Sequence, residues 1–171
     1  MIIPKIIRFK SDQEKFLSER LLANAPYEGC ALLIGQEIFF SDQEEEKIIY
    51  EVNHIWTCRN VWEPNKFNLN ETANDSEYES HMPPSKVNRY LIDPKDQFQA
   101  QRWARRKKWK VLGSAHSHPG SNNSPSALDV HWANSPCLCV IANRQGEIKA
   151  WWIDENKDLH QIKVIYTIES K

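Results

Sequence analysis

The segment VLGSAHSHPG at residues 111–120 contains the most informative pattern in the chain. Val111–Ala115 has the composition of a buried strand, and His116 and His118 follow it at positions i and i+2. Side chains two residues apart on an extended chain leave the same face, with Cα atoms about 6.6 Å apart, so both imidazole rings can face one ion. Pro119 favours this conformation, because a residue that precedes proline is driven into the β region. The segment therefore predicts a strand that ends in a pair of metal ligands.

A third candidate ligand follows shortly after the two histidines. Residues 124–129 read SPSALD, which predicts the start of a short helix with Ser126 as its N-cap and Asp129 in its first turn. By itself this pattern indicates only an ordinary capping box. Side chains of a first helical turn point back toward the helix N-terminus, so Asp129 can also face His116 and His118. Two histidines and one carboxylate are a usual protein ligand set of catalytic zinc, which keeps its fourth position for water.

The overall composition is that of one soluble globular domain. The chain has 171 residues, of which 40% are hydrophobic and 26% charged, and its formal net charge is −1. At this length folding buries roughly 70% of the unfolded surface, so a metal is expected to be functional rather than structural. A net charge near zero argues against a protein that coats nucleic acid or membranes. Because the amino-terminal apolar stretch is too short for a signal peptide and no run could span a membrane, we expect a cytoplasmic protein.

Hydrophobic periodicity and turn signals predict a mixed α/β fold. Ser11–Glu14 has the form of a capping box and predicts a helix that ends by Pro26. Asp93 and Pro94 predict a second helix, which would run to about Lys110. The hydrophobic runs predict strands at residues 2–9, 28–34, 38–40, 47–53, 89–92, 111–115, 137–143, 148–153 and 162–168. The strand at 38–40 is expected to pair with the strand at 28–34 as a hairpin. This order favours one sheet sandwiched by helices over a doubly wound parallel sheet.

Two segments have a distinct composition. Residues 54–88 lack periodicity and predict a long irregular excursion, in which Trp56 and Trp62 argue against pure disorder. Residues 102–110 contain six Lys or Arg side chains. Basic residues near a helix C-terminus are favoured by the helix dipole, so we interpret this cluster as a solvated helical face rather than a nucleic-acid site. The four cysteines include no C-x-x-C pair and are expected to be free.

The H-S-H-P motif followed by S-x-x-D resembles the site of the JAMM/MPN+ zinc metalloproteases, in particular their compact single-domain prokaryotic members. In that family a glutamate on an upstream strand completes the site, and Glu28 in the run EGCALLIG at residues 28–35 matches it. The run YLIDP at residues 90–94 resembles the start of a family helix. The resemblance extends over nearly the whole chain except residues 54–88, where family members differ. Gly29 and Cys30 stand where many members have Cys-Gly, which leaves Glu28 in place.

The resemblance implies a single MPN/JAMM-like domain over residues 1–171, of the cytidine-deaminase-like α/β type, with a variable insertion at about 54–88. It implies one Zn²⁺ held by His116, His118 and Asp129. It also implies that Glu28 acts as general base on zinc-bound water and that Ser126 stabilises the oxyanion. Without the resemblance Glu28 is only an acid at a strand start, a place where acids are ordinarily exposed.

The implied activity is that of a metallo(iso)peptidase that cleaves after the C-terminal Gly-Gly of a ubiquitin-like or sulfur-carrier protein. Such a protein is the expected partner, with no nucleic acid or membrane, and Trp56, Trp62 and Phe67 are candidates to dock its globular part. The alternative is a catalytically silent MPN-type interaction module, which would be expected to have lost at least one of the site residues. A cupin-like oxygenase would require a glutamate soon after His118, and residues 119–126 contain none.

Overall fold

The computed structural model describes residues 3–42, 45–64 and 84–167. Its helices are α1 (Gln13–Leu22), α2 (Pro94–Arg106) and α3 (Ala127–Trp132). Its strands are β1 (Ile6–Lys10), β2 (Cys30–Asp42), β3 (Glu45–Cys58), β4 (Lys110–Ser117), β5 (Cys137–Ala142), β6 (Ile148–Ile153) and β7 (Leu159–Thr167). Most predicted elements are therefore present, with shifted ends.

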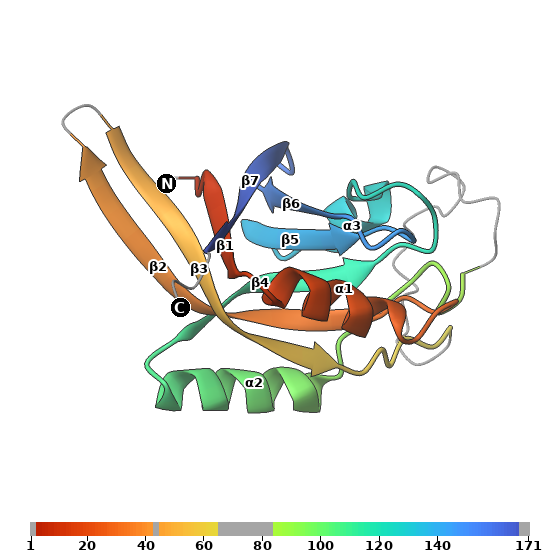
Figure 1. Ribbon diagram of the computed structural model, residues 1–171. Coiled ribbons are helices and arrows are strands. Elements are labelled where there is room, and N and C mark those ends of the chain that lie inside the picture. The colour runs from red at the N-terminus through yellow and green to blue at the C-terminus, as the bar shows by residue number, and fades with distance from the viewer. Residues whose placement is uncertain (1–2, 43–44, 65–83, 168–171) are drawn as a thin grey trace.

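The strands form one mixed sheet that closes on itself (Figure 1). Their order is β1-β3-β2-β4-β5-β6-β7, and closure arises because β1 also pairs with β7. β1 is parallel to both of its neighbours and β4 is parallel to β5, whereas the other pairs are antiparallel. The predicted mixed sheet is confirmed. Its closure depends on pairing between the two ends of the chain, for which the local pattern gives no signal.

Both faces of the first part of the strand β2, Cys30–Ile34, are buried. Ala31 and Leu33 contribute to the core inside the sheet, where Leu17 and Leu21 of α1 also pack. The alternate residues Cys30, Leu32 and Ile34 face outward and pack with Ala100 and Ala104 of α2. Side chains alternate between the two faces of a strand, so a run that is apolar at every position requires cover on both sides. This requirement explains why helices sandwich the sheet.

The predicted hairpin between residues 28–34 and 38–40 is wrong. β2 continues through this region, and Ile38 pairs with Ile49 of β3. At Gly35 the chain does not turn; the register with β3 shifts there instead. A Cβ atom on Gly35 would lie 1.8 Å from the carbonyl oxygen of Glu51, so glycine is required here for close backbone approach.

The start of α1 was predicted wrongly and the start of α2 correctly. The capping box at Ser11 is wrong, because α1 has Asp12 as its N-cap and that side chain makes no capping bond. Instead, the Gln13 side chain accepts a hydrogen bond from the Lys10 amide at 3.0 Å. At α2 the prediction is confirmed: Pro94 opens the helix and the Asp93 carboxylate accepts from the Lys95 amide at 2.8 Å.

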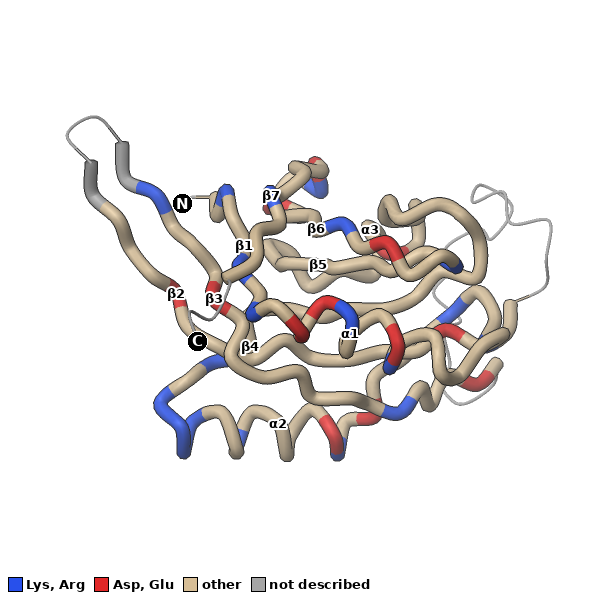
Figure 2. The backbone as a smooth tube through the Cα atoms, in the orientation of Figure 1, with Lys and Arg blue, Asp and Glu red and all other residues tan. Residues whose placement is uncertain are grey.

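Residues 84–110 differ from the prediction at two places. α2 ends at Arg106, so Lys110 begins β4. The strand predicted at 89–92 is reduced to one bridge, between Ile92 and Asn60. The ladder does not extend further because the Leu91 amide donates to the Asn60 side chain rather than to a strand backbone. The basic residues at the C-terminal end of α2 are exposed, as predicted. Figure 2 shows how Lys and Arg gather at this end of the helix and just after it.

Residues 54–58 belong to β3, so the irregular segment begins later than predicted. Phe67 and the rest of 65–83 lie outside the described residues. That residues 1–171 form one domain remains a prediction.

The cysteines Cys30, Cys58, Cys137 and Cys139 are free, as expected. Across the described ranges, no helix is both long enough and apolar enough to cross a membrane.

Candidate metal centre

The predicted ligands His116, His118 and Asp129 converge on one point. The two Nε2 atoms lie 3.0 Å apart, and each lies 3.3 Å from an oxygen of the Asp129 carboxylate. Zinc binds imidazole nitrogen and carboxylate oxygen at about 2.0–2.2 Å, which makes the edge of a tetrahedral site about 3.3 Å. His116 faces Oδ1 of Asp129 and His118 faces Oδ2, and each of the three separations is close to this edge length, so the residues present fit this metal.

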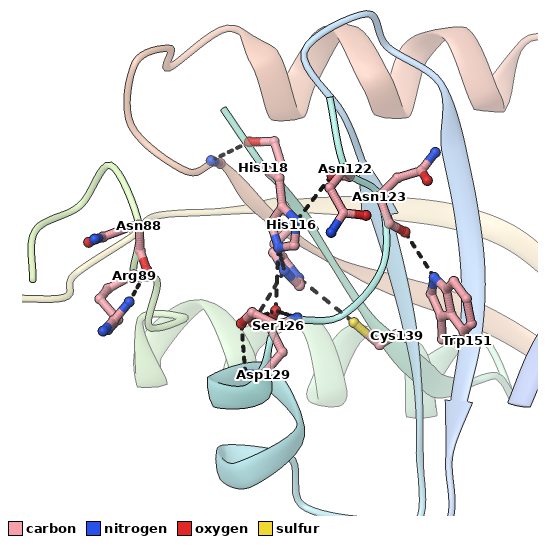
Figure 3. Close-up of polar contacts among 12 residues, drawn as sticks. Asn88, Arg89, His116, His118, Asn122, Asn123, Ser126, Asp129, Cys139 and Trp151 are labelled. Carbon is pink, nitrogen blue, oxygen red and sulfur yellow. Dashed lines mark hydrogen bonds and ion pairs between the residues drawn. The ribbon is translucent and has the colours of Figure 1, made fainter. Parts of the chain in front are cut away.

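Each imidazole is oriented through its other ring nitrogen (Figure 3). His116 Nδ1 lies 3.8 Å from the Cys139 thiol, and His118 Nδ1 lies 3.2 Å from the Asn122 carbonyl oxygen. The Tyr90 ring stacks on His116 with centroids 4.4 Å apart. Contacts of this kind fix the orientation of a ligating imidazole and leave Nε2 directed at the metal. His116 is fully buried, and burial lowers its pKa, so it is held as the neutral imidazole that binds metals.

Asp129 is placed by the capping box that the sequence predicted. Its amide donates to Ser126 Oγ at 3.1 Å, and its Oδ2 accepts from both the amide and the hydroxyl of Ser126 at 2.7 Å. Burial alone would raise the Asp129 pKa, but the facing His116 and hydrogen bonds from His116, His118 and Ser126 hold it well below its usual range. The residue is therefore an oriented, ionised carboxylate, which is the form that binds a cation.

Glu28 lies at the same end of the sheet, immediately before β2. Ser117 donates from its amide to the Gly29 carbonyl at 3.0 Å, and the Gly29 amide donates to Ser117 Oγ at 2.9 Å. These bonds extend the contact between β2 and β4 by one residue beyond the pair Cys30 and His116, and Glu28 follows at the end of β2 that lies beside the ligands. Glu28 is 6% exposed, contrary to what its position in the sequence alone suggests.

The electrostatic surroundings of Glu28 are unusual for a carboxyl group. Burial raises its pKa to about 8, the negative charge of Asp129 adds to the rise, and Arg89 partly opposes it. Such a shift is typical of acids at functional sites. A cation between Glu28 and Asp129 would favour the ionised form of both.

A cavity of about 310 Å³ lies beside one of the three ligands, Asp129, which lines it. Its walls come from the segment before α2, from β4 and β5, and from the end of α3, and they include Tyr90, Ser114, Cys139 and Trp132. Asp129 is the charged residue in this lining. Asp129 therefore borders a mainly apolar hollow in the part of the chain that the structure describes.

The structure adds residues that the sequence did not assign to the site. Tyr90 and Cys139 contact His116, and Arg89 acts on Glu28. Cys139 packs in a hydrophobic cluster with Ile141 and Ile153 and contacts His116 from there. None of the three has a recognisable spacing from the histidines, because they reach the site from different strands and loops.

The metal-free protein should lose stability through Glu28 as the pH rises from about 4.5 to 8. In this range the folded protein holds a proton on Glu28 that the unfolded chain has released, so the free energy of unfolding falls with pH. Glu28→Gln is expected to raise the free energy of unfolding at pH 7 by roughly 3 kcal/mol and at pH 5 by less than about 1 kcal/mol. Urea denaturation of both proteins in chelator measures this, and an equal difference at the two pH values would contradict it.

Ser126→Ala should weaken the start of α3. The change removes the hydroxyl that caps Asp129 but leaves the Ser126 amide bonded to Oδ2. Loss of such a cap is expected to lower the free energy of unfolding by about 1 kcal/mol. Urea denaturation of the metal-free protein measures the loss, with Ser124→Ala as the control because it keeps every bond between residues 126 and 129. Equal stabilities of the two variants would refute the capping role.

Comparison with known proteins identifies the family. The family described as prokaryotic homologs of the JAB domain matches residues 12–154. A desampylase of Pyrococcus furiosus is 29% identical over 77 residues, which are 44% of this chain and 55% of that protein, so the chain matches just over half of its relative's length. A solution structure from Desulfitobacterium hafniense has a TM-score of 0.68 at 20% identity, covering 96% of this chain and 95% of the other. A second, from Salinibacter ruber, has a TM-score of 0.59 at 20% identity and covers 95% and 93% of the two chains. The solved structures support the fold, and the family match establishes that this chain belongs to the prokaryotic homologs of the JAB domain.

Proposed function

We propose that the protein is a zinc-dependent peptidase or isopeptidase that cleaves after the C-terminal Gly-Gly of a ubiquitin-like or sulfur-carrier protein. The observation that carries this proposal is the convergence of His116, His118 and Asp129, together with the buried acid Glu28, whose carboxyl is affected by the charge of Asp129. The family and the similarity to a desampylase support a hydrolase of this kind. Four free cysteines fit the reducing cytoplasm that we predict as its location.

His116, His118 and Asp129 would hold the metal, with one nitrogen or oxygen from each. Bound there, zinc would supply Lewis-acid chemistry: it lowers the pKa of a coordinated water to about 7 and polarises a carbonyl oxygen. The neutral His116 and the ionised Asp129 are already in the protonation states that this role requires. Their orientation by Cys139, Asn122 and Ser126 requires little rearrangement on binding.

Glu28 would move the proton. As an ionised carboxylate it would accept a proton from the attacking water and then deliver it to the nitrogen of the leaving amine. A general acid–base group of this kind contributes roughly 10²–10⁴-fold to the rate. Burial raises the pKa of this carboxyl to about 8 in the metal-free protein, and a bound cation beside it would lower that pKa. The group would then be ionised before the first step and still basic enough to hold the proton until the second.

Ser126 would stabilise the oxyanion that develops on the substrate. Its hydroxyl now donates to Asp129 Oδ2, and a hydroxyl has one proton to donate. The proposed role therefore requires the hydroxyl to turn from Asp129 to the substrate oxygen. The Ser126 amide would keep Oδ2 in place meanwhile, since it bonds the same oxygen at 2.7 Å.

The family resemblance supports the proposed substrate class. An extended Gly-Gly tail has no side chains and can approach a buried catalytic site that bulkier residues cannot reach. The cavity beside Asp129 offers room for neighbouring parts of the substrate. The proposed partner is this protein substrate, with neither nucleic acid nor membrane.

Intact-mass spectrometry tests the proposal. Purified protein, supplied with zinc, would be incubated with ubiquitin-like proteins that carry a C-terminal extension after Gly-Gly. The expected product ends at the second glycine. A matched substrate with Ala-Ala in place of Gly-Gly should be cut at least about tenfold more slowly, because two methyl groups enlarge a tail that must fit a narrow site. Intact substrate in every reaction with zinc-loaded protein would favour the silent interaction module instead.

A further inference from the structure

We propose that Asn60 is a positioning residue that holds Glu28 and the segment Arg89–Tyr90 in register with the metal ligands. This inference deepens the proposed function and rests on it for the catalytic part of its test. Asn60 lies just after β3, is half-buried, and belongs to no motif in the sequence.

The Asn60 carboxamide makes four hydrogen bonds, all to main-chain atoms. Its Nδ2 donates to the carbonyl oxygens of Glu28 at 2.9 Å and of Arg89 at 3.0 Å. Its Oδ1 accepts from the amides of Leu91 and Trp62, each at 3.1 Å. A carboxamide has two donors and two principal acceptor sites, so its capacity is used completely. An aspartate at this position would provide the acceptors without the donors.

Glu28 depends on these bonds because it lies past the last paired residue of β2. Its amide donates to the Lys86 carbonyl at 2.8 Å, and its own carbonyl accepts from Asn60. The residue is 6% exposed, and a buried carbonyl without a donor carries the full cost of its lost hydration. Removal of the Asn60 donors would therefore drive the Glu28 backbone away from its present place.

The second donor of Asn60 anchors the other wall of the site. It holds the carbonyl of Arg89, the residue whose positive charge partly offsets the burial of Glu28. The next residue, Tyr90, stacks on the ligand His116 at 4.4 Å with an interplanar angle of 22°. One amide group thus fixes the backbone of the proposed base and of the ring that supports a metal ligand. Displacement of a catalytic group by about 1 Å can cost about 100-fold in rate.

Asn60→Asp replaces the two donors with a charged oxygen, while it keeps the shape of the side chain and the acceptors. The expected result on a Gly-Gly fusion is a kcat lower by about 10- to 100-fold, with KM within about threefold of wild type and zinc still one per chain. The matched control is Arg59→Ala. Arg59 bonds Asp93 and Asp96 and so connects the same segment to α2, but it makes no bond to Glu28 or Arg89. The kcat of Arg59→Ala should therefore stay within about threefold of the wild-type value.

A kcat of Asn60→Asp equal to wild type would overturn the proposal, and so would an equal loss in Arg59→Ala. A loss of zinc from Asn60→Asp would also overturn it, because Asn60 would then act on metal retention rather than on the base.

A double-mutant cycle tests Asn60 without catalysis. In metal-free protein at pH 7, Glu28→Gln is expected to shift the unfolding equilibrium strongly toward the folded state. In the Asn60→Ala background the shift should be at least about fivefold smaller, because a released Glu28 can reach water. Alanine is used because aspartate would add a charge. Additive effects would overturn the role of Asn60, whereas coupling in a protein that cleaves no Gly-Gly fusion would refute only the proposed function.

Discussion

Glu28→Gln should lower kcat on a Gly-Gly fusion by about 10²–10⁴-fold while one zinc per chain remains bound. The amide keeps the shape of the side chain but cannot accept the proton of the attacking water. The residues that could hold a metal are His116, His118 and Asp129. Glu28 is not one of them, so its replacement should leave the zinc content unchanged. Steady-state kinetics together with elemental analysis of the same sample measure both quantities.

The control for this experiment is Glu51→Gln. Glu51 also lies on the sheet, in β3, but it pairs with Arg8 and Gln36, away from the ligands. A partly exposed ion pair contributes little, so the control should retain activity within about twofold. Wild-type turnover in Glu28→Gln would remove Glu28 from the mechanism. Loss of zinc from that variant would contradict the base assignment as well, because Glu28 would then act as a ligand.

Asp129→Asn is expected to raise the dissociation constant for zinc by at least about 100-fold, since changes to residues that merely orient ligands already cost 10- to 100-fold. The Asp129 carboxylate supplies the negative charge of the ligand set, and asparagine offers only a neutral carbonyl oxygen. Activity should fall in parallel. Competition with a chromophoric chelator measures the zinc affinity of both proteins.

The matched control for Asp129 is Asp154→Asn. Asp154 also faces a histidine, with His160 Nε2 at 2.8 Å, but it lies in the turn between β6 and β7 and outside the three-residue cluster. Its replacement should leave zinc affinity within about threefold. Equal affinities of Asp129→Asn and wild type would show that the carboxylate only caps α3.

The local features of the fold could be predicted because each depends on a few adjacent residues. The alternation of buried residues in β2, the proline at the start of α2 and the strand that ends in His116 and His118 all have signals in the sequence. The capping box of Ser126 and Asp129 is confirmed for the same reason. The capping box at Ser11 failed because the Gln13 side chain bonds the chain before the helix, and local pattern cannot exclude such a competitor.

Features that depend on distant segments could not be read from the local sequence. The closure of the sheet, the shift at Gly35 and the burial of Glu28 each involve residues far apart along the chain. Residues alone gave Glu28 no role, and only the family resemblance pointed to it. Asn60 was missed because its importance lies in four contacts with main-chain atoms, which leave no mark on side-chain spacing. The catalytic roles of Glu28 and Ser126 remain predictions.

The most direct test of the central claim is the zinc content of the purified protein by elemental analysis. The two Nε2 atoms lie 3.0 Å apart, and each lies 3.3 Å from one of the two Asp129 oxygens, which predicts one zinc per chain in the wild type. The double variant His116→Ala, His118→Ala should contain none, although it should stay folded by circular dichroism. Zinc content that is the same in the folded double variant as in the wild type would contradict the assignment of this site.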